Sequence, residues 1–243
     1  MKKGNFDIAT VPKNGYLIFP LSMSRLSNAQ APSLLYEFLK FFETKIKVIS
    51  LDVIFLYTND LYLSVEGRAI EIRKKVLHQM INHKTEFLSI LFGERKYVPS
   101  AFHFLPWDYA VLNSERFSEL HASLVKAKKE NKGFQEALLR DLKKAGREET
   151  DANINFLIEE IIVSHLLAQK EIPLPHTLTI PDGYRLICYP GNPLFSWVYA
   201  YQNNLVPKRT DLPEGHLLFA RSFYNIDNKI LIDFDSTNLE DLS

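Results

Sequence analysis

The chain has 243 residues, of which 46% are hydrophobic and 24% are charged. This composition is typical of a globular protein and excludes a disordered or fibrous one. The 29 basic and 29 acidic residues give a formal net charge of zero. Zero charge argues against a protein dedicated to coating DNA or RNA, which would carry a basic excess, but leaves room for transient RNA contact through a local patch. The length is near the upper limit for one hydrophobic core, so we expect one α/β domain over residues 1–243.

The cellular compartment of the protein can be inferred from three features that the sequence lacks: a membrane span, a signal peptide and a pair of cysteines. No apolar run approaches the ~18 residues that a membrane span needs. Lys2 and Lys3 are followed by Asn5 and Asp7, where a signal peptide would have its apolar stretch. The single cysteine, Cys188, cannot form an internal disulfide. We therefore expect a cytoplasmic monomer that binds neither a membrane nor DNA.

The first half of the chain alternates short apolar runs with helical patterns. The predicted elements are strands at 16–21 and 53–57 (or 48–51) and helices at 32–42 and from 67 to about 91. Strand followed by helix, twice, predicts a Rossmann-like α/β fold with a mostly parallel sheet flanked by helices. Ligands of such sheets bind beyond the carboxyl ends of the strands. Ser22 stands at one of these ends.

The second half is predicted to be helical first and extended afterwards. Helical patterns cover residues 114–167, with breaks at 131–133 and 146–151, and the last helix is expected at 153–167. After a connector containing Pro173, Pro175 and Pro181, the predicted elements are a buried strand at 184–189 and a hairpin formed by 217–224 and 229–234.

Common catalytic signatures are missing from the sequence. There is no Gly-rich phosphate loop, no His-Glu-x-x-His or paired-Cys metal motif, and no Gly-x-Ser-x-Gly elbow. We therefore expect no metal and no cofactor. The remaining candidates are Ser22, the carboxylates Glu159 and Glu160 within an apolar helix, and Tyr189 at the end of a strand. Taken alone they have ordinary interpretations, with Ser22 as a helix cap, the glutamates as solvated side chains and Tyr189 as a core residue.

Four segments occur in one order along the chain: residues 17–24, residues 52–56 followed by Gly67 and Arg68, residues 156–160, and residues 186–190. Together they resemble the cyclodipeptide synthases. Residues 17–24 (LIFPLSMS) are similar to the first strand and nucleophile turn of that family. Residues 52–56, followed by Gly67 and Arg68, resemble its second strand and the start of its basic helix. Residues 156–160 resemble its catalytic helix and 186–190 its last conserved strand. The resemblance covers about 16–209 and leaves 210–243 as a C-terminal hairpin and tail.

The resemblance implies an aminoacyltransferase whose substrates are two aminoacyl-tRNAs. Ser22 would accept the first aminoacyl group as an ester, a second aminoacyl-tRNA would extend it to a dipeptidyl-enzyme, and cyclisation would release a 2,5-diketopiperazine. Because the amino acids arrive already activated, no ATP is needed, although the implied fold is similar to the catalytic domain of class I tyrosyl- and tryptophanyl-tRNA synthetases. Arg25, Tyr189 and Pro190 match the Tyr-Pro branch of the family.

The resemblance also assigns roles to the candidate residues. Glu160 would anchor the substrate ammonium and assist proton transfer, and Tyr189 would orient groups or relay protons near Ser22. A shift of one residue in the alignment would instead make Glu159 the functional carboxylate. One departure concerns Pro20, which stands where the family usually has glycine.

An aliphatic pocket for the first amino acid is implied as well. Ile18, Ile54 and Ile187 would line it, which favours a small or apolar first residue. The full set of implied substrate-binding residues is Ile18, Ile54, Leu56, Phe156, Ile187 and Pro190. Phe156 is a second departure, because the family often has tyrosine there and phenylalanine has no hydroxyl.

The long helix has a basic face. At ~100° per residue, Arg68, Lys74, Lys75 and His78 share one half of the helical wheel. The other half is predicted to hold Ala69, Ile72, Val76, Leu77, Met80 and Ile81. The family uses the matching helix to bind tRNA, which favours a tRNA-binding face over an ordinary solvated one.

Two other functions compete with this hypothesis. A noncatalytic tRNA- or RNA-binding module would keep the basic face and would not need Ser22 or Tyr189. A serine hydrolase or acyltransferase acting on another activated ester would need a base near Ser22, for which His165 and His176 are the candidates. Three further residues are expected to be structural: Cys188 on the sheet face opposite Tyr189, and Trp107 and Trp197 in the core.

Overall fold

The computed structural model of the protein describes residues 15–46, 51–94, 102–108, 114–168, 184–206, 222–225, 230–233 and 238–242. Within these ranges the chain forms a six-stranded sheet in the order β3-β2-β1-β4-β5-β6. The strands are β1 (Gly15–Leu21), β2 (Leu51–Tyr57), β3 (Phe102–Pro106), β4 (Tyr184–Pro190), β5 (Ser222–Asn225) and β6 (Ile230–Asp233). All neighbouring pairs are parallel except β5 with β6. The predicted mostly parallel sheet is confirmed.

The strand order places a topological switch point beside β1. Chain order runs outward from β1 to β2 and β3 on one side, and from β1 to β4 and β5 on the other. This is the arrangement of dinucleotide-binding folds, in which the crevice at the carboxyl ends of the first and fourth strands binds the ligand. In this protein those two ends are Leu21 and Pro190.

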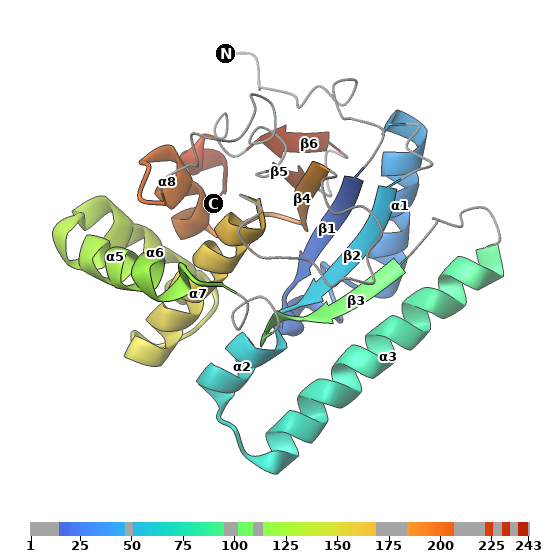
Figure 1. Ribbon diagram of the computed structural model, residues 1–243, viewed down its shortest axis with the longest axis horizontal. Coiled ribbons are helices and arrows are strands. Elements are labelled where there is room, and N and C mark those ends of the chain that lie inside the picture. Colours follow the sequence, from blue (N-terminus) through green and yellow to red (C-terminus); the bar gives the residue numbers. More distant parts are fainter. Residues whose placement is uncertain are drawn as a thin grey trace.

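Helices cover both faces of the sheet (Figure 1). α1 (Pro32–Ile46) and α3 (Ile70–Glu94) lie on one side. On the other side are α5 (Phe117–Glu130), α6 (Lys132–Lys144), α7 (Asp151–Ala168) and α8 (Phe195–Gln202). The remaining helices are α2 (Asn59–Glu66) and the short 3-10 helices η2 (Met23–Arg25) and η4 (Leu239–Leu242). Within the described ranges, no helix has both the length and the apolar character to cross a membrane.

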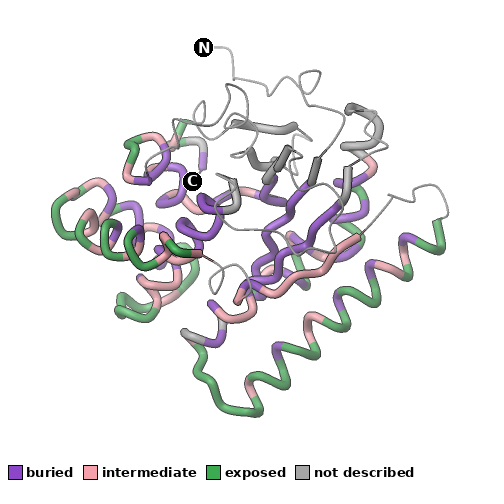
Figure 2. The backbone as a smooth tube through the Cα atoms, in the orientation of Figure 1, coloured by how far each residue is buried: buried purple, intermediate pink, exposed green. Residues whose placement is uncertain are grey.

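The central strands are apolar without alternation because both of their faces are buried. Phe19 and Phe55 point toward α1 and α3, where their rings pack on Phe38 and Phe87 at centroid distances of 4.9 Å each. The residues at the alternating positions of these strands, such as Ile18, point to the opposite face of the sheet and pack under α7. Figure 2 shows this continuous buried core in the sheet, in contrast to the mostly exposed α3.

Cys188 and Tyr189 lie on opposite faces of the sheet, as predicted. Cys188 belongs to the core under α1 and α3, and Tyr189 to the core under α7. Trp107 and Trp197 are both buried in the latter core, which confirms their structural interpretation.

The predicted helix break at 131–133 has a clear physical cause. The Asn131 side chain caps α6 by accepting a hydrogen bond from the Phe134 N–H at 2.9 Å. The Tyr199 hydroxyl of α8 also donates to Asn131, at 3.1 Å. Gly133 lies directly against Tyr199, so that a side chain there would collide with the ring. The break is therefore the point where α8 packs onto α6.

The predicted faces of the long helix were partly wrong. Leu77 and Ile81, which were placed on the apolar half, are 54% and 49% exposed. The buried positions of α3 are Val76, His83, Phe87 and Leu91. A pattern based on apolar residues misses this stripe because one of its members is a histidine. In addition, Arg68 and Ala69 precede the helix, which begins at Ile70.

Other boundaries follow the predictions closely. The strand predicted at 53–57 is β2, and the helix predicted at 153–167 is α7. The predicted hairpin is confirmed for β5 and β6, which pair antiparallel. The elements α2, β3 and α8 were not predicted. The proline-rich connector lies outside the described residues.

Candidate active site

The switch point brings Ser22 and Tyr189 to the same edge of the sheet. Ser22 directly follows β1, and Tyr189 is the next-to-last residue of β4. The two strands are neighbours, with Ile18 opposite Ile187. Continuing that register places Tyr189 beside the end of β1. Two residues that are 167 positions apart in the chain thus share one site.

Ser22 is not a conventional helix cap. Its backbone is extended, with φ −82° and ψ 126°, and its side chain makes no capping bond to η2. The hydroxyl instead pairs with the Ser24 hydroxyl at 3.1 Å. The carbonyl of Ser22 accepts a hydrogen bond from the Arg25 N–H at 2.9 Å. Ser22 is 7% exposed, so the residue is almost completely covered by the surrounding fold.

Gln30 is a residue of this site that sequence reasoning missed. Its side chain is fully buried and accepts a hydrogen bond from the Ser22 N–H at 2.7 Å. Its Nε2 donates toward the carbonyls of Pro190 at 3.3 Å and Pro20 at 3.5 Å. Hydrogen bonding to the same side chain also lowers the pKa of Tyr189, against the larger effect of burial. One amide therefore joins the ends of both strands and both candidate catalytic residues.

Gln30 is itself held by α3. Its carbonyl lies 2.8 Å from His83 Nε2, and His83 Nδ1 lies 2.9 Å from the Tyr57 hydroxyl. Because a carbonyl can only accept, Nε2 carries the proton and Nδ1 accepts from Tyr57. Burial lowers the pKa of His83, which favours this neutral form. The buried chain Tyr57–His83–Gln30 thus connects the long helix to the Ser22 turn.

Glu160, Tyr189 and Arg25 form an electrostatic cluster. Glu160 is 3% exposed, and burial raises its pKa to about 7 against the opposing effect of Arg25. Burial likewise raises the pKa of Tyr189 to about 12. The Arg25 guanidinium lies over the Tyr189 ring, 5.5 Å from its centroid. A carboxyl group with a pKa near neutrality can both accept and return a proton in this range.

Glu159 faces a different environment. Burial raises its pKa to about 7 as well, but its charged neighbours are Asp60 and Arg68, which lie in and just after α2. The charges that act on Glu160 are instead Arg25, Asp141 and Arg147. Of the two carboxylates, Glu160 is therefore the one that the fold brings to Tyr189.

Arg147 lies beside Phe156, the position where the family that the sequence resembles often has tyrosine. Its guanidinium lies over the Phe156 ring, 5.0 Å from the centroid. The same charge lowers the pKa of Glu160. Since Phe156 has no hydroxyl, this part of the site offers a cation and a carboxylate rather than a phenol.

Three of the six implied substrate-binding residues are in register across the sheet. Ile18 of β1 lies opposite both Ile54 of β2 and Ile187 of β4, which places the three in one row across the sheet. Ile18, Ile54 and Leu56 are buried in the core that also contains the inner face of α7. Pro190 is buried, and its carbonyl is one of the groups bound by Gln30. The side chain of Ile187 lies outside the described residues.

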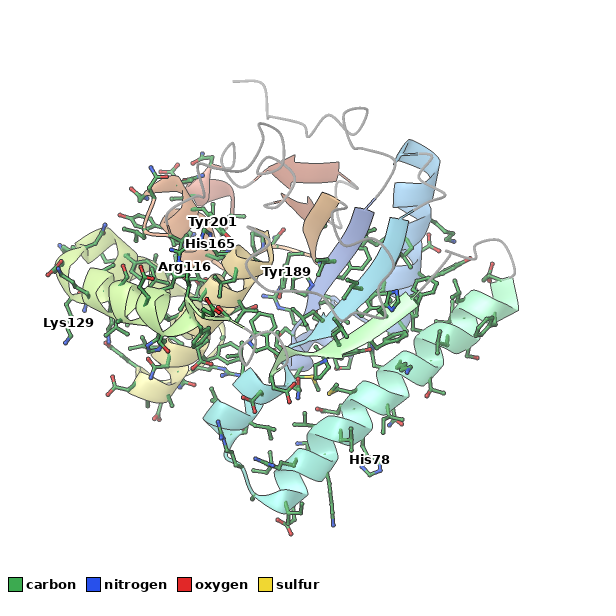
Figure 3. The ribbon with its side chains drawn as sticks, viewed as in Figure 1. His78, Arg116, Lys129, His165, Tyr189 and Tyr201 are labelled. Atoms are coloured by element: carbon green, nitrogen blue, oxygen red, sulfur yellow. The ribbon has the colours of Figure 1, made fainter. Side chains whose placement is uncertain are left out.

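One member of the predicted basic face, His78, projects from α3 away from Tyr189 in the view of Figure 3. Arg68, Lys74, Lys75 and His78 are all exposed. His78 Nδ1 lies 3.0 Å from the Lys74 carbonyl one turn earlier. These four side chains are therefore accessible from solution, and Arg68 also lowers the pKa of Glu159.

A hydrolase-type base is not found beside Ser22 among the described residues. The Ser22 hydroxyl pairs with Ser24, whereas the ring of His165 packs near Tyr201 of α8 with centroids 5.9 Å apart (Figure 3). His176 lies outside the described residues. No cluster of three or more His, Cys, Asp or Glu residues in the described ranges is placed to hold a metal ion.

The parallel sheet and its switch point define a Rossmann-like α/β protein. Within that class, the chain is similar to a solved CDPS, or cyclodipeptide synthase, from Fluoribacter dumoffii, with a TM-score of 0.53 at 16% identity, covering 81% of this chain and 86% of that one. It is also similar to a CDPS from Staphylococcus haemolyticus, with a TM-score of 0.50 at 13% identity over 81% and 86% of the two chains.

A cyclodipeptide synthase from Bacillus thermoamylovorans has a TM-score of 0.50 at 11% identity, with 82% of this chain and 85% of that one covered. At such identities the likeness establishes the fold. No protein-family model matches the sequence, and a comparison with curated proteins gave no match.

Proposed function

We propose that this protein is a tRNA-dependent cyclodipeptide synthase of the Tyr-Pro branch. The observation that carries the proposal is the placement of Ser22 at the switch point, joined through Gln30 to Tyr189, in a fold shared with proteins described as cyclodipeptide synthases. Glu160 and Arg25 complete the same cluster. The proximity of Glu160, Tyr189 and Arg25, which come from separate segments of the chain, supports the proposal.

In the first step, Ser22 Oγ attacks the ester carbonyl of an aminoacyl-tRNA. The bond from that carbonyl to the terminal ribose oxygen breaks, and the Ser22 proton ends on the ribose hydroxyl. The amino acid remains as an ester on Ser22. Tyr189, at the adjacent strand end, is suited to orient the reacting groups or to pass this proton.

In the second step, the α-amine of the Ser22-bound amino acid attacks the ester of a second aminoacyl-tRNA. This direction of attack is required if the dipeptide is to stay on the enzyme. The attacking amine must be neutral, and Glu160, with a pKa of about 7, is suited to remove the proton from the ammonium form. The second tRNA leaves with the proton on its ribose oxygen.

In the last step, the free amine of the dipeptidyl group attacks the Ser22 ester. A second amide bond forms, the Ser22 oxygen recovers its proton, and a 2,5-diketopiperazine is released. Holding both amino acids at one site makes these steps effectively unimolecular, which contributes ~7–11 kcal/mol at best. The aliphatic row of Ile18, Ile54 and Ile187 favours a small or apolar first amino acid.

The proposal is tested by mass spectrometry of medium from cells that overexpress the protein. A diketopiperazine present with the native chain and absent with Ser22→Ala is expected, and it would also identify the two amino acids. A folded native protein that yields no diketopiperazine would contradict the proposal and favour a noncatalytic RNA-binding role.

A further inference from the structure

A second feature lies next to the Ser22 turn, on the far side of Arg25. It is a cavity of about 430 Å³ between η2, the C-terminal end of α6 and the segment leading into α8. Three cationic side chains, Arg25, Arg140 and Lys144, contribute to its lining. Ser22, Glu160 and Tyr189 do not line it, so Arg25 is the one member of the catalytic cluster that borders this cavity.

The charge in this cavity is predominantly positive. Arg25 donates to the Asn192 carbonyl at 3.0 Å, and Lys144 donates to the Leu242 carbonyl at 3.1 Å. Within the described part of the chain, neither these two cations nor Arg140 forms a salt bridge with a carboxylate. Arginine and lysine gathered in this way, with spare N–H donors, are suited to a phosphate group.

The one carboxylate in the lining is already engaged. The two oxygens of Asp141 accept hydrogen bonds from the first N–H groups of α8, Phe195 at 2.9 Å and Ser196 at 2.7 Å. Its charge therefore serves to cap α8, the favourable position for an anion at a helix N-terminus. The three cationic side chains outnumber this one carboxylate, so the side chains that line the cavity carry a net positive charge.

An aromatic platform stands beside these cations. The guanidinium of Arg140 lies over the Phe195 ring, 4.1 Å from the centroid, and Phe195 is half-buried in the cavity wall. Proteins that bind unpaired nucleotides combine cationic groups for the backbone with aromatic rings and arginine planes for the bases. The volume is also within the range of small-ligand sites.

We propose that this cavity binds the unpaired 3′-terminal nucleotides of an aminoacyl-tRNA, with phosphate against the three cations and a base against Phe195. The inference rests on the proposed function, because the ester that Ser22 attacks is carried by the terminal nucleotide. Arg25 links the cavity to the Ser22 site. Its backbone N–H donates to the Ser22 carbonyl at 2.9 Å, and its side chain both lines the cavity and lies over the Tyr189 ring.

The test uses the full-length protein and the labelled trinucleotide CCA, the unpaired end of tRNA, without an amino acid. Arg140→Ala/Lys144→Ala should weaken its binding by about tenfold or more, and should flatten the dependence of log affinity on log salt by up to about 1.4 units, since each single-strand phosphate contact contributes about 0.7. Phe195→Leu should weaken binding roughly tenfold with an unchanged salt slope. Melting curves confirm that each variant is folded.

The matched control is Lys129→Ala/Lys143→Ala, which removes the same charge from exposed positions of α5 and α6 outside the cavity. Figure 3 shows Lys129 at the outer edge of these helices. The control should bind the trinucleotide within about twofold of the native chain. Equal loss in both double variants, unaltered binding in Arg140→Ala/Lys144→Ala, or no binding by the native chain would overturn the site.

Competition with inorganic phosphate distinguishes a nucleotide-binding site from a site that binds free phosphate. Displacement of the trinucleotide by phosphate at an equal concentration would show a simple phosphate site and overturn the nucleotide assignment. Acylation of Ser22 by an aminoacyl ester without RNA tests the proposed function separately. A native chain that binds the trinucleotide at this cavity but is never acylated would support the site and contradict the synthase.

Discussion

The side-chain oxygen of Gln30 accepts a hydrogen bond from the backbone N–H of Ser22 at 2.7 Å. The amide nitrogen of the same side chain reaches the carbonyls of Pro20 and Pro190. Gln30 therefore fixes the turn that carries the proposed nucleophile and ties it to the strand that carries Tyr189. We therefore propose that Gln30 positions the candidate catalytic groups without taking part in bond making.

Gln30→Leu should remove all of these bonds while keeping a side chain of similar length. We expect the free energy of unfolding to fall by ~1–3 kcal/mol, because buried polar groups lose their partners. Acylation of Ser22 should fall roughly 10- to 100-fold at temperatures where the variant is fully folded, because small displacements of reacting groups are costly. Gln135→Leu, at a half-buried position of α6, is the matched control. Full acylation by a folded Gln30→Leu variant would remove Gln30 from the site.

Glu160→Gln should reduce diketopiperazine formation far more than Glu159→Gln. The reason is that Glu160 interacts with Arg25 and lies in the cluster of Tyr189, whereas Glu159 faces Asp60 and Arg68. Loss of a group that moves a proton in the reaction typically costs about 10²- to 10⁴-fold in rate. Product yield from the two purified variants decides the question. Similar losses, or the reverse order, would show that Glu159 is the functional carboxylate.

The pH dependence of stability provides a test of Glu160 that does not depend on activity. Its pKa rises from 4.5 to about 7 on folding, so between these values the folded state binds a proton that the unfolded state has lost. The contribution of Glu160 to the free energy of unfolding is therefore greatest below pH 4.5 and declines as the pH rises to about 7. A glutamine at position 160 does not titrate in this range, so the variant does not lose stability in this way as the pH rises. The free energy of unfolding of Glu160→Gln, relative to the native chain, should rise by up to about 3 kcal/mol from pH 4.5 to 8.

Urea denaturation at several pH values between 5 and 8 measures this difference. A difference that stays constant across the range would mean that Glu160 titrates with an ordinary pKa and that its environment is more polar than the fold indicates.

Much of the fold could be predicted because buried parallel strands leave unbroken apolar runs in the sequence. β1, β2 and β4 are of this kind. β3 was missed because it is a half-buried strand that contains His103 and ends at Pro106. α8 was missed because its start is defined by Asp141, which lies 54 residues before Phe195 and caps the helix from α6.

Residues of the candidate site could be predicted only where they belong to a recognisable segment. Ser22, Glu160 and Tyr189 stand in such segments. Gln30 follows a mixed segment that ends in Ser27, Asn28 and Ala29 and gives no periodic signal, because its hydrogen bonds depend on two strand ends that meet only in the fold. His83 was overlooked for a related reason, since a polar residue in a buried helical stripe cannot be recognised from apolar periodicity.

The basic face of α3 is expected to bind tRNA independently of the amino acid that it carries. Lys74→Ala/Lys75→Ala should weaken tRNA binding and flatten the salt dependence of log affinity by roughly one to two units. Transfer to Ser22 from an aminoacyl ester without tRNA should change little, because α3 presents these lysines to solvent. The control is Lys126→Ala/Lys129→Ala on α5, where both lysines are exposed as well. Unaltered tRNA binding at low and moderate salt would leave α3 with an ordinary solvated face.

The proposed mechanism depends most of all on a covalent bond to Ser22. The native chain is incubated with an aminoacyl-tRNA that carries a labelled amino acid, digested, and analysed by mass spectrometry. We expect the label on the peptide that contains Ser22, and its complete loss in Ser22→Ala, whose fold should persist because the hydroxyl makes no capping bond. A label on Cys188, or on no residue of the folded native chain, would contradict the mechanism.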